Sequence, residues 1–448
     1  MTLKISNTLT RAKENFIPID EKNIRMYVCG PTVYDYPHVG NARPLIVFDI
    51  LFRLLSKLYP KSKVTYVRNI TDIDDKIIEA SNKLNISIQD LTNKVTKDFH
   101  NDCHYLGCLN PTVEPKATEH LNEMVSLIQK LLKNGFAYLS NDHVYFQVSK
   151  FKKYGNLSNK KIEELISGSR IEVSENKKEP GDFVLWKPSK DNEPSWDSPF
   201  GKGRPGWHLE CSAMSEKYLG NHFDIHGGGL DLIFPHHENE IAQSVCANNN
   251  EKFSNYWLHN GYVTVDKQKM SKSLGNFITI NELKKKYNGQ VVRLAMLSTH
   301  YTQPFDWNEN ILEASNKNLD KWYEFYSESD DKIDEENLKF LLDDLNTPLM
   351  ISNIHELYKK AKSGDTLSAK QLSSSCKFLG LFNQKPNEWK NFKKIGKISS
   401  EEIEELISKR NEARLKKDFK TSDEIRDLLN SKGVLIKDKN GNTTWEYK

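Results

Sequence analysis

The sequence predicts an α/β fold, in which a parallel sheet with helices on its faces is split by an insertion and followed by α-helical C-terminal domains. Three observations predict it. The chain opens with a strand–helix–strand pattern, which is typical of a parallel sheet. A long stretch rich in Lys, Glu, Gly and Pro then occupies 156–206, and strand-like sequence returns at 223–226. Beyond residue 280, helical spacing dominates.

The opening unit consists of a short apolar run, a loop and an amphipathic helix. Residues 24–29 read IRMYVC, which indicates a buried strand, and the run ends at Gly30-Pro31. A helix is expected over 43–58, with Pro44 in its first turn, where proline is tolerated. One face of that helix carries Leu45, Phe48, Phe52 and Leu55. A second strand is expected over 64–70.

The middle of the chain predicts an interruption of the sheet. A helix is expected over 120–133 and a strand over 144–151, after which 156–206 is expected to be irregular. The sheet resumes with strands at 223–226 and 256–265. An inserted region therefore separates two halves of one sheet.

The last third is expected to be helical. Helical spacing is present over 280–299, 308–326, 335–362 and 368–381. A lysine-rich linker over 387–397 precedes a final helical pair that begins at Ser400. A hairpin over 434–447 closes the chain, with its turn at Asn440-Gly441.

Composition excludes several classes of protein. The 448 residues correspond to about two to four domains. Aromatic residues make up 10% and the net charge is only +3, which argues against global disorder and leaves any basic surface local. The most apolar segment, Pro44–Leu55, is interrupted by Asp49 and Arg53, so no membrane partner is expected. The N-terminus has no apolar signal core, and six cysteines without a CxxC pair suit a reducing cytoplasm.

Two short motifs suit phosphate binding. The first is His38-Val39-Gly40-Asn41, between the first strand and its helix, where free backbone N–H groups and the helix dipole attract anions. An ordinary loop with an asparagine helix cap is the simpler interpretation of this motif alone. The second is Lys269–Ser273 (KMSKS), a cationic run followed by Gly275 that is suited to closing over a polyphosphate. A solvated basic loop is its alternative.

The two motifs in this order resemble the signatures of class I aminoacyl-tRNA synthetases, with Pro31 to Asn41 as the HIGH-type segment. Four further runs narrow the resemblance to the cysteinyl-tRNA synthetases, at 27–35, 69–76, 206–212 and 226–240. Asn41 stands where the family usually has a histidine, and asparagine keeps a hydrogen-bond donor there. The resemblance covers the whole chain.

The resemblance implies a Rossmann-like catalytic domain and a division of the chain into six segments. These are two catalytic halves at 1–110 and 206–268, an inserted region at 111–205, a KMSKS and stem-contact region at 269–315, a helical anticodon-binding bundle at 316–399, and a small anticodon-recognition domain at 400–448. It also implies a cytoplasmic enzyme that works as a monomer.

A metal site is the third candidate feature. Cys29 ends the first strand, and His236 and Glu240 are spaced i, i+4, so that a helix places them on one face. His237 with Glu240, at i, i+3, is a competing pair that spacing leaves open. The resemblance selects Cys29, Cys211, His236 and Glu240 as ligands of one Zn²⁺. The other cysteines, which are Cys103, Cys108, Cys246 and Cys376, are interpreted as structural.

The resemblance further implies ligation of L-cysteine to tRNA(Cys) with ATP and Mg²⁺. The implied catalytic residues are His38, Asn41, Lys269 and Lys272, and the implied ATP-binding residues add Gly40, Gly227, Gly228, Gly229 and Asp231. Cysteine is expected to bind among Gly30, Thr32, Trp207, His208 and His226. Zinc favours a soft thiolate over a serine hydroxyl, which implies rejection of serine without an editing domain.

Two rival functions stay open at this stage. One is a related ligase that joins cysteine to an amino sugar, which lacks an anticodon module. The other is a non-catalytic, zinc-containing RNA-binding relative. The basic run Lys409–Lys420 with the nearby Trp445 and Tyr447 suits an RNA backbone and an unpaired base. A solvated, mixed-charge helix is the alternative for that run.

Overall fold

The computed structural model describes residues 2–160, 175–191, 193–249, 252–270, 274–329, 332–392, 400–416, 418–432, 434–439 and 442–447. Within these ranges no helix has both the length and the apolar character needed to cross a membrane.

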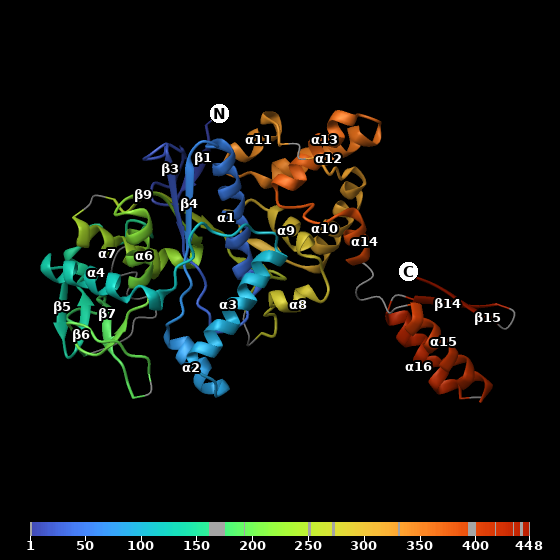
Figure 1. Ribbon diagram of the computed structural model, residues 1–448, viewed down its shortest axis with the longest axis horizontal. Helices are drawn as coiled ribbons and strands as arrows, with labels where there is room; N and C mark the ends of the chain where they lie inside the picture. The colour runs from blue at the N-terminus through green and yellow to red at the C-terminus, as the bar shows by residue number, and fades with distance from the viewer. Residues whose placement is uncertain are drawn as a thin grey trace.

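A four-stranded parallel sheet organises the first half of the chain, in the order β10-β9-β3-β4. Its strands are β3 (Asn23–Val28), β4 (Lys63–Arg68), β9 (Phe223–Gly229) and β10 (Ser254–Asn260). Alternate side chains of β3 enter two different cores, with Met26 facing α1 (Val39–Leu58) and Tyr27 facing α6 (Leu209–Leu219). Figure 1 shows the sheet between these two helices. The predicted α/β fold with a split parallel sheet is confirmed.

Helix α1 begins earlier than its spacing predicts. His38 is the N-cap, and its Nδ1 accepts a hydrogen bond from the Gly40 backbone at 3.0 Å. Asn41 Oδ1 in turn accepts from the His38 backbone N–H at 3.0 Å, so the two side chains cap the helix reciprocally. Pro44 therefore lies in the second turn, and its predicted place in the first turn is wrong. The start of the helix was missed because helix N-caps are usually recognised by Ser, Thr, Asp or Asn, and here the N-cap is a histidine.

The chain between β4 and β9, which includes the inserted region 111–205, holds more regular structure than predicted. Ahead of the inserted sheet lie the helices α2 (Asp75–Leu84), α3 (Ile88–Tyr105) and α4 (Leu121–Lys133). An antiparallel sheet follows, with strands β5 (Ala137–Ser140), β6 (His143–Phe146), β7 (Phe183–Pro188) and β8 (Gly203–Pro205). The expectation of irregular chain over 156–206 is wrong at β7 and β8. Pairing with β6 orders β7, and such a partner distant in sequence leaves no local signal.

A small sheet carries the start of the lysine motif, in the order β12-β11-β13. It comprises β11 (Val263–Val265), β12 (Gln268–Lys269) and β13 (Phe305–Trp307). The strand predicted over 256–265 breaks at Gly261, where a Cβ would lie 2.3 Å from the Gln303 carbonyl oxygen. The helix predicted over 280–299 is two helices, α8 (Ile280–Lys284) and α9 (Gly289–Leu297), because Asn288 caps the second.

The rest of the chain is helical apart from two hairpins. Its helices are α10 (Glu309–Trp322), α11 (Glu335–Leu342), α12 (Thr347–Lys362), α13 (Thr366–Phe378), α14 (Pro386–Phe392), α15 (Ser400–Leu415) and α16 (Phe419–Ser431). The hairpins are β1 (Lys4–Asn7) with β2 (Ala12–Asn15), and β14 (Val434–Lys439) with β15 (Asn442–Tyr447). The predicted turn at Asn440-Gly441 lies outside the described residues.

The single helix predicted over 335–362 is interrupted between α11 and α12. Asp344 and Leu345 there have φ of 62° and 52°, which is costly for residues other than glycine. Hydrogen bonds hold the turn, since the Asp344 carboxylate accepts from the Ser6 backbone at 2.7 Å and from the Tyr301 hydroxyl at 2.8 Å. Contacts with the N-terminal hairpin therefore end the helix, where the local pattern would continue it.

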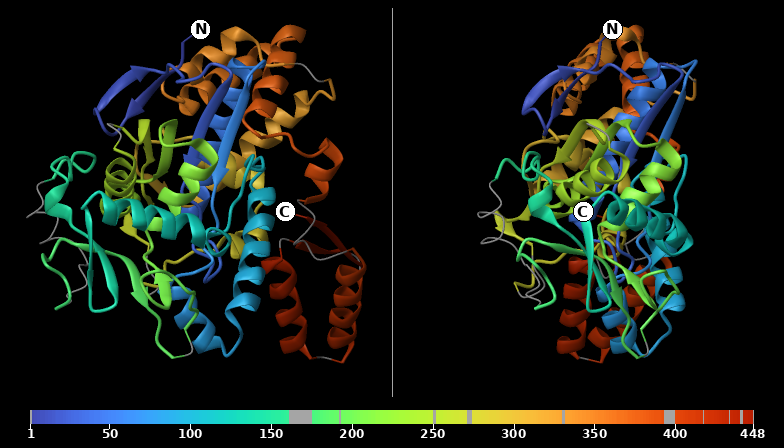
Figure 2. Two further views of the ribbon diagram at one scale, coloured as in Figure 1. Left: turned by 60° about the vertical axis from the view of Figure 1, so that its left-hand side comes forward. Right: turned by 90° about the vertical axis from the view of Figure 1, so that its left-hand side faces the viewer.

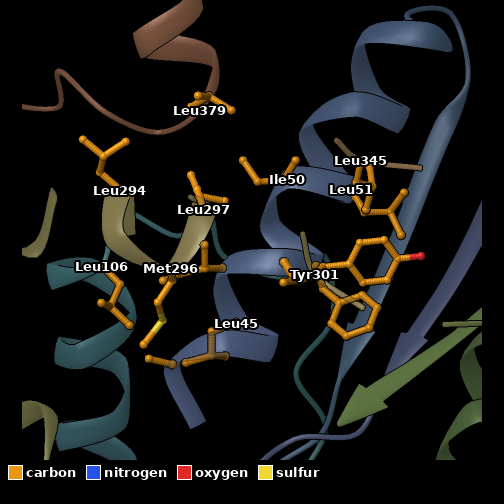
Figure 3. Packing of buried hydrophobic residues seen from close by; sticks show 14 of the residues in the cluster. Leu45, Ile50, Leu51, Leu106, Leu294, Met296, Leu297, Tyr301, Leu345 and Leu379 are labelled. Carbon is orange, nitrogen blue, oxygen red and sulfur yellow. The ribbon is translucent and has the colours of Figure 1, made fainter. Parts of the chain in front are cut away.

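One large core joins the parallel sheet to the helical region. Figure 3 shows Leu45 and Ile50 of α1 on the side of Leu294, Met296 and Leu297 of α9, with Leu106 and Leu379 nearby, whereas Leu51 lies on the other side of α1 next to Leu345. In Figures 1 and 2 the sheet of the insertion lies on the opposite side of the parallel sheet from this helical region. Helices α15 and α16 with the last hairpin have a core of their own, made of Ile403, Ile407, Leu429 and Val434.

Candidate active site

Four metal-binding side chains meet at the carboxyl end of β3. Cys29 follows β3 directly, Cys211 lies in the first turn of α6, and Glu240 lies in the first turn of α7 (Glu238–Asn248). His236 comes from the short helical turn before α7. One ligand atom from each lies within 4.8 Å of all the others. The site is therefore assembled from three segments that are distant in the sequence.

The distances within this cluster fit a tetrahedral ion. The Cys29 and Cys211 sulfurs are 3.7 Å apart, close to the roughly 3.8 Å that two Zn–S bonds of about 2.3 Å span in a tetrahedron. Cys29 Sγ lies 3.5 Å from His236 Nε2 and 3.4 Å from Glu240 Oε1. Two sulfurs, one imidazole and one carboxylate form a donor set that Zn²⁺ accepts.

A second grouping shares part of the first. Cys29, His226, His237 and Glu240 also bring four ligand atoms within 4.8 Å. Two of its members also make hydrogen-bond contacts: His226 Nε2 lies 2.8 Å from Glu240 Oε2, and His237 Nδ1 lies 2.8 Å from His259 Nε2. The sequence left open whether His236 or His237 is the ligand, and in the structure each of them belongs to one of the two groupings. The first grouping has two sulfur donors and the second has one.

Burial and mutual hydrogen bonding set the protonation of the cluster. Burial raises the pKa of the Cys29 thiol well above its usual value, and hydrogen bonding to Cys211 adds to this. Burial also opposes ionisation of Cys211, but the hydrogen bond from Cys29 and the nearby His236 imidazole bring the pKa of Cys211 down to about 7. Burial opposes the charged form of His236 too, and the Glu240 carboxylate outweighs it and raises the pKa of His236 to about 10. Within the cluster the Cys211 thiol therefore ionises more readily than the Cys29 thiol.

Aromatic and histidine side chains surround the cluster. The Trp207 ring lies 4.6 Å from the His236 ring and is 42% exposed, so it lies between the cluster and solvent. His208 Nδ1 is 2.9 Å from His236 Nδ1, and burial lowers the pKa of His208 well below its usual value. His226 is buried and stacks on Trp257 with ring centres 4.4 Å apart. The predicted substrate residues Trp207, His208 and His226 therefore lie together at the cluster.

Two polar residues at the end of β4 escaped prediction as site residues. Asn69 Oδ1 accepts from the Gly30 backbone at 2.9 Å and lies 3.7 Å from Cys211 Sγ. The Thr71 backbone pairs with the segment that holds Thr32, and its hydroxyl donates to buried Glu210 at 2.6 Å. A Cβ at Gly30 would lie 1.6 Å from the Asn69 carbonyl oxygen, so this approach requires glycine. The sequence signal that could have identified Asn69 and Thr71 as site residues is their position directly after β4, a strand adjacent to β3.

The two phosphate motifs meet in space. The Val39 backbone N–H donates to the Ile278 carbonyl at 3.0 Å, and the Ile280 N–H donates to the Pro37 carbonyl at 2.9 Å. A Cβ placed on Gly40 would lie 3.4 Å from Met270 Cε, so Met270, the second residue of the lysine motif, lies against the first helical turn. Lys272, Ser271 and Ser273 lie outside the described residues, and of Lys269 only the backbone is described.

Comparison with known proteins identifies the family. Residues 15–317 match the family described as tRNA synthetases class I (C) catalytic domain, and residues 399–445 match the Cysteinyl-tRNA ligase anticodon binding domain. The chain is 57% identical to a cysteine–tRNA ligase of Pelagibacter ubique over 447 residues, 99% of each chain. It is 50% identical to the cysteine–tRNA ligase of Beijerinckia indica over 100% of each chain. The chain belongs to the cysteine–tRNA ligase family.

Solved structures agree with this membership at the level of the fold. A Mycobacterium tuberculosis methionyl-tRNA synthetase in complex with methionyl-adenylate has a TM-score of 0.56 at 13% identity, covering 84% of this chain and 96% of that one. A leucyl enzyme of Agrobacterium radiobacter in a ternary complex has a TM-score of 0.54 at 10% identity, covering 81% and 83%. The predicted class I synthetase fold is confirmed. The match over 399–445 argues against the amino-sugar ligase, which lacks such a module.

In this family member packing requires two glycines of the run 227–229. A Cβ on Gly227 would lie 2.2 Å from the Phe48 ring of α1, and a Cβ on Gly228 would lie 2.9 Å from the His237 ring. The atom nearest to a Cβ on Gly229 would be Asp231 Oδ1, at 2.4 Å, which is the end of an exposed side chain that can move aside. Packing therefore explains Gly227 and Gly228 without a nucleotide, and it does not explain Gly229.

The C-terminal module uses several of its predicted RNA-binding groups internally. Trp445 Nε1 donates to Glu404 Oε1 at 2.6 Å, and its ring packs against the small core. Arg410 and Arg414 both bind the Asp438 carboxylate, at 2.8 and 2.9 Å. For this part of the surface the structure favours the alternative of a mixed-charge helix.

Proposed function

We propose that this member of the cysteine–tRNA ligase family activates L-cysteine with ATP and transfers it to the 3′ end of tRNA(Cys). In the first step a cysteine carboxylate oxygen attacks the α-phosphate of ATP·Mg²⁺, and pyrophosphate leaves. In the second step a terminal ribose hydroxyl attacks the acyl carbon, and AMP leaves. The observation that carries the proposal is that one fold holds both the cluster of Cys29, Cys211, His236 and Glu240 at the end of β3 and the contact between the two phosphate motifs at the N-terminus of α1.

The cluster is proposed to select the amino acid. Zn²⁺ held by Cys29, Cys211, His236 and Glu240 would supply a Lewis acid that lowers the pKa of the substrate thiol and binds sulfur far better than a hydroxyl. The sulfur–sulfur distance of 3.7 Å and the burial of Cys211, His236 and Glu240 support this choice. His226 orients Glu240 through its 2.8 Å contact, and His208 does the same for His236 at 2.9 Å.

Gly30, Thr32 and Trp207 are proposed to complete the cysteine site. Gly30 permits the close approach of β3 and β4, and Thr32 lies in the segment paired with Thr71. Trp207, half-exposed beside His236, is proposed to cover the bound amino acid. An apolar indole over the site excludes water and strengthens the electrostatic contacts inside.

The phosphate groups are assigned to the motifs that meet over α1. His38 Nδ1 accepts from the Gly40 backbone, so the proton of the neutral ring is on Nε2, which we propose donates to a phosphate. Asn41 and Gly40 share the helix N-terminus with it, where anions are favoured. Lys272, supported by Lys269, is proposed to neutralise the departing pyrophosphate. Gly227–Gly229 and Asp231 are proposed to contact the adenosine.

A cobalt-substituted enzyme tests the metal assignment directly. Replacing Zn²⁺ by Co²⁺ is expected to give a sulfur-to-cobalt charge-transfer band that strengthens when cysteine is added and stays unchanged with serine, because only sulfur adds to the soft donor set. Absorption spectroscopy on the purified protein measures it. His236→Ala is expected to weaken the band and His237→Ala to retain it. The opposite pattern would assign the site to the grouping with His226 and His237.

The six segment boundaries given above remain our proposal for the domain organisation, with 316–399 and 400–448 assigned to the anticodon arm of tRNA(Cys). A chain that ends at Ser399 is expected to keep cysteine-dependent pyrophosphate exchange within about twofold, since both phosphate motifs and the cysteine cluster precede residue 280. Charging of tRNA(Cys) is expected to fall at least about tenfold, because contacts that fix the RNA's register supply much of its affinity. Equal charging by the two chains would remove the anticodon role from 400–448.

A further inference from the structure

Arg43 is a fully buried cation, and none of the described residues forms an ion pair with it. It lies on α1, one turn beyond Val39, and its exposed fraction is 0%. In the described part of the chain, the ion pairs of α1 join Asp49 to Arg53 and Arg293, and no ion pair includes Arg43. Burial alone lowers the pKa of Arg43 to about 10. Removing a guanidinium from water is costly. The contacts that Arg43 makes inside the protein must offset this cost, and they indicate its role.

Those contacts are backbone carbonyls of one segment. Arg43 Nη2 donates to the carbonyl oxygen of Gln303 at 2.6 Å, and to those of His300 at 3.1 Å and Tyr301 at 3.4 Å. The guanidinium also lies 5.4 Å from the centre of the Phe305 ring. Among the described residues its Nε and Nη1 groups have no hydrogen-bond partner. The side chain is therefore directed at segment 300–305 through one of its three nitrogens.

Segment 300–305 leads into β13 and is hydrogen-bonded to the residues that precede β11, so it supports the small sheet β12-β11-β13. The Gly261 N–H donates to the Tyr301 carbonyl at 2.8 Å, and the Phe305 N–H donates to the Tyr262 carbonyl at 2.8 Å. Strand β13 pairs with β11, and β11 pairs with β12, which ends at Lys269. Fixing this segment fixes the sheet from which the lysine motif begins.

We propose that Arg43 is a positioning residue for cysteine activation. It holds the sheet that carries Lys269 at a set distance from the N-terminus of α1, which carries His38 and Asn41. The start of α1 is attached to the region of the lysine motif at two places. Backbone hydrogen bonds join 37–39 to 278–280, and one helical turn further along α1 the Arg43 side chain binds the Gln303 carbonyl. The inference rests on the proposed roles of the two phosphate motifs.

Neither an apolar side chain nor a lysine makes this attachment. An apolar side chain of similar volume fills the space without the cost of burying a charge, yet it makes none of the three hydrogen bonds to segment 300–305, including the 2.6 Å bond to the Gln303 carbonyl. Lysine keeps the charge, but its side chain is one bond shorter and has no planar group to lie against the Phe305 ring, so it does not reproduce the contact. A displacement of about 1 Å between catalytic groups costs about 10²-fold in rate, which makes a rigid attachment valuable.

Arg43→Lys tests the proposal against a matched buried arginine. Cysteine-dependent pyrophosphate exchange is expected to lose at least about tenfold in kcat, with the KM for cysteine within about twofold. Arg293→Lys is the control, because Arg293 is equally buried and binds Asp49 and the Leu379 carbonyl, away from the small sheet. It is expected to lower the melting temperature and to leave kcat within about twofold. Equal losses of kcat in both variants would show a general structural role and overturn the proposal.

Combination with Lys272→Ala identifies the route of the effect. If Arg43 acts through the lysine motif, Arg43→Lys loses most of its effect in the Lys272→Ala background, whereas independent effects multiply. Full multiplication overturns the proposal. If Lys272→Ala alone leaves exchange unchanged, the proposed lysine role fails and the comparison with Arg293→Lys still decides for Arg43.

A second variant covers the case in which Arg43→Lys does not fold. Phe305→Leu keeps an apolar side chain in the core and removes the ring beside the guanidinium. It is expected to lower kcat by at least about threefold at unchanged KM for cysteine, since the cation–π contact helps to hold the guanidinium on segment 300–305. An unchanged kcat in a folded Phe305→Leu enzyme contradicts the proposal.

Discussion

Removal of the metal is expected to reduce the discrimination between cysteine and serine to what the shape of the pocket alone provides. The two amino acids differ in volume so little that a pocket acting through shape separates them by only about 10–200-fold, whereas a site that binds a specific group of the substrate reaches about 10⁴-fold or more. Chelated enzyme and Cys211→Ser are therefore both expected to show a cysteine-to-serine ratio of kcat/KM within the lower range. Pyrophosphate exchange with each amino acid, run beside an elemental analysis for zinc, measures both quantities.

Cys246→Ser is the matched control for this experiment. Cys246 is a buried thiol on α7, the helix that carries Glu240, and it belongs to neither of the two metal-binding groupings. It is expected to retain zinc and the full discrimination ratio. A metal-free enzyme that still separates cysteine from serine by several orders of magnitude would refute the metal-based selection and assign the selection to shape or hydrogen bonding.

Lys272→Ala is expected to lower the rate of cysteine activation by about 10²-fold or more. Charge develops on the leaving pyrophosphate only as the reaction proceeds, so a lysine placed there stabilises the transition state more than bound ATP. The loss is therefore expected in kcat, with the KM for cysteine nearly unchanged. Steady-state pyrophosphate exchange over a range of cysteine and ATP concentrations separates the two parameters.

Lys267→Gln provides a charge control within the same stretch of chain. Lys267 is exposed and lies in the turn between β11 and β12, where its backbone N–H donates to Asp306 Oδ1 at 2.6 Å. The substitution removes one positive charge near the motif and keeps that backbone contact. We expect exchange within about twofold of the parent. A collapse of cysteine affinity in Lys272→Ala, with the rate per bound substrate retained, would contradict the assignment.

The sequence by itself determined the fold class and the membership of the family. Apolar runs with a strand–helix–strand order predicted the parallel sheet, because a strand buried on both faces must be apolar throughout. Long motifs around Cys29, Cys211 and 226–240 predicted the family that the comparisons confirmed. Local spacing also brought His236 and Glu240 to one helical face, as the structure shows.

The ends of two helices could not be predicted from local sequence patterns. Helical spacing continues through 280–299 and 335–362, yet the structure breaks both segments. The first break follows a side-chain cap at Asn288, and the second follows the docking of Asp344 on Ser6, which is 338 positions away in the chain. A partner so distant in sequence leaves no trace in local periodicity, so tertiary contact overrides it.

Only the tertiary structure decided which groups meet. It brought Asn69 and Thr71 to the cysteine cluster, paired His237 with His259, and laid Met270 over Gly40. It also turned the Arg43 side chain from an ordinary helical position to the carbonyls of segment 300–305. Residue type and spacing fix which chemistry a side chain offers and which helical face it occupies. Its partners depend on strand order and on the packing of α1 against α9, and these are set by the whole buried core rather than by any one segment.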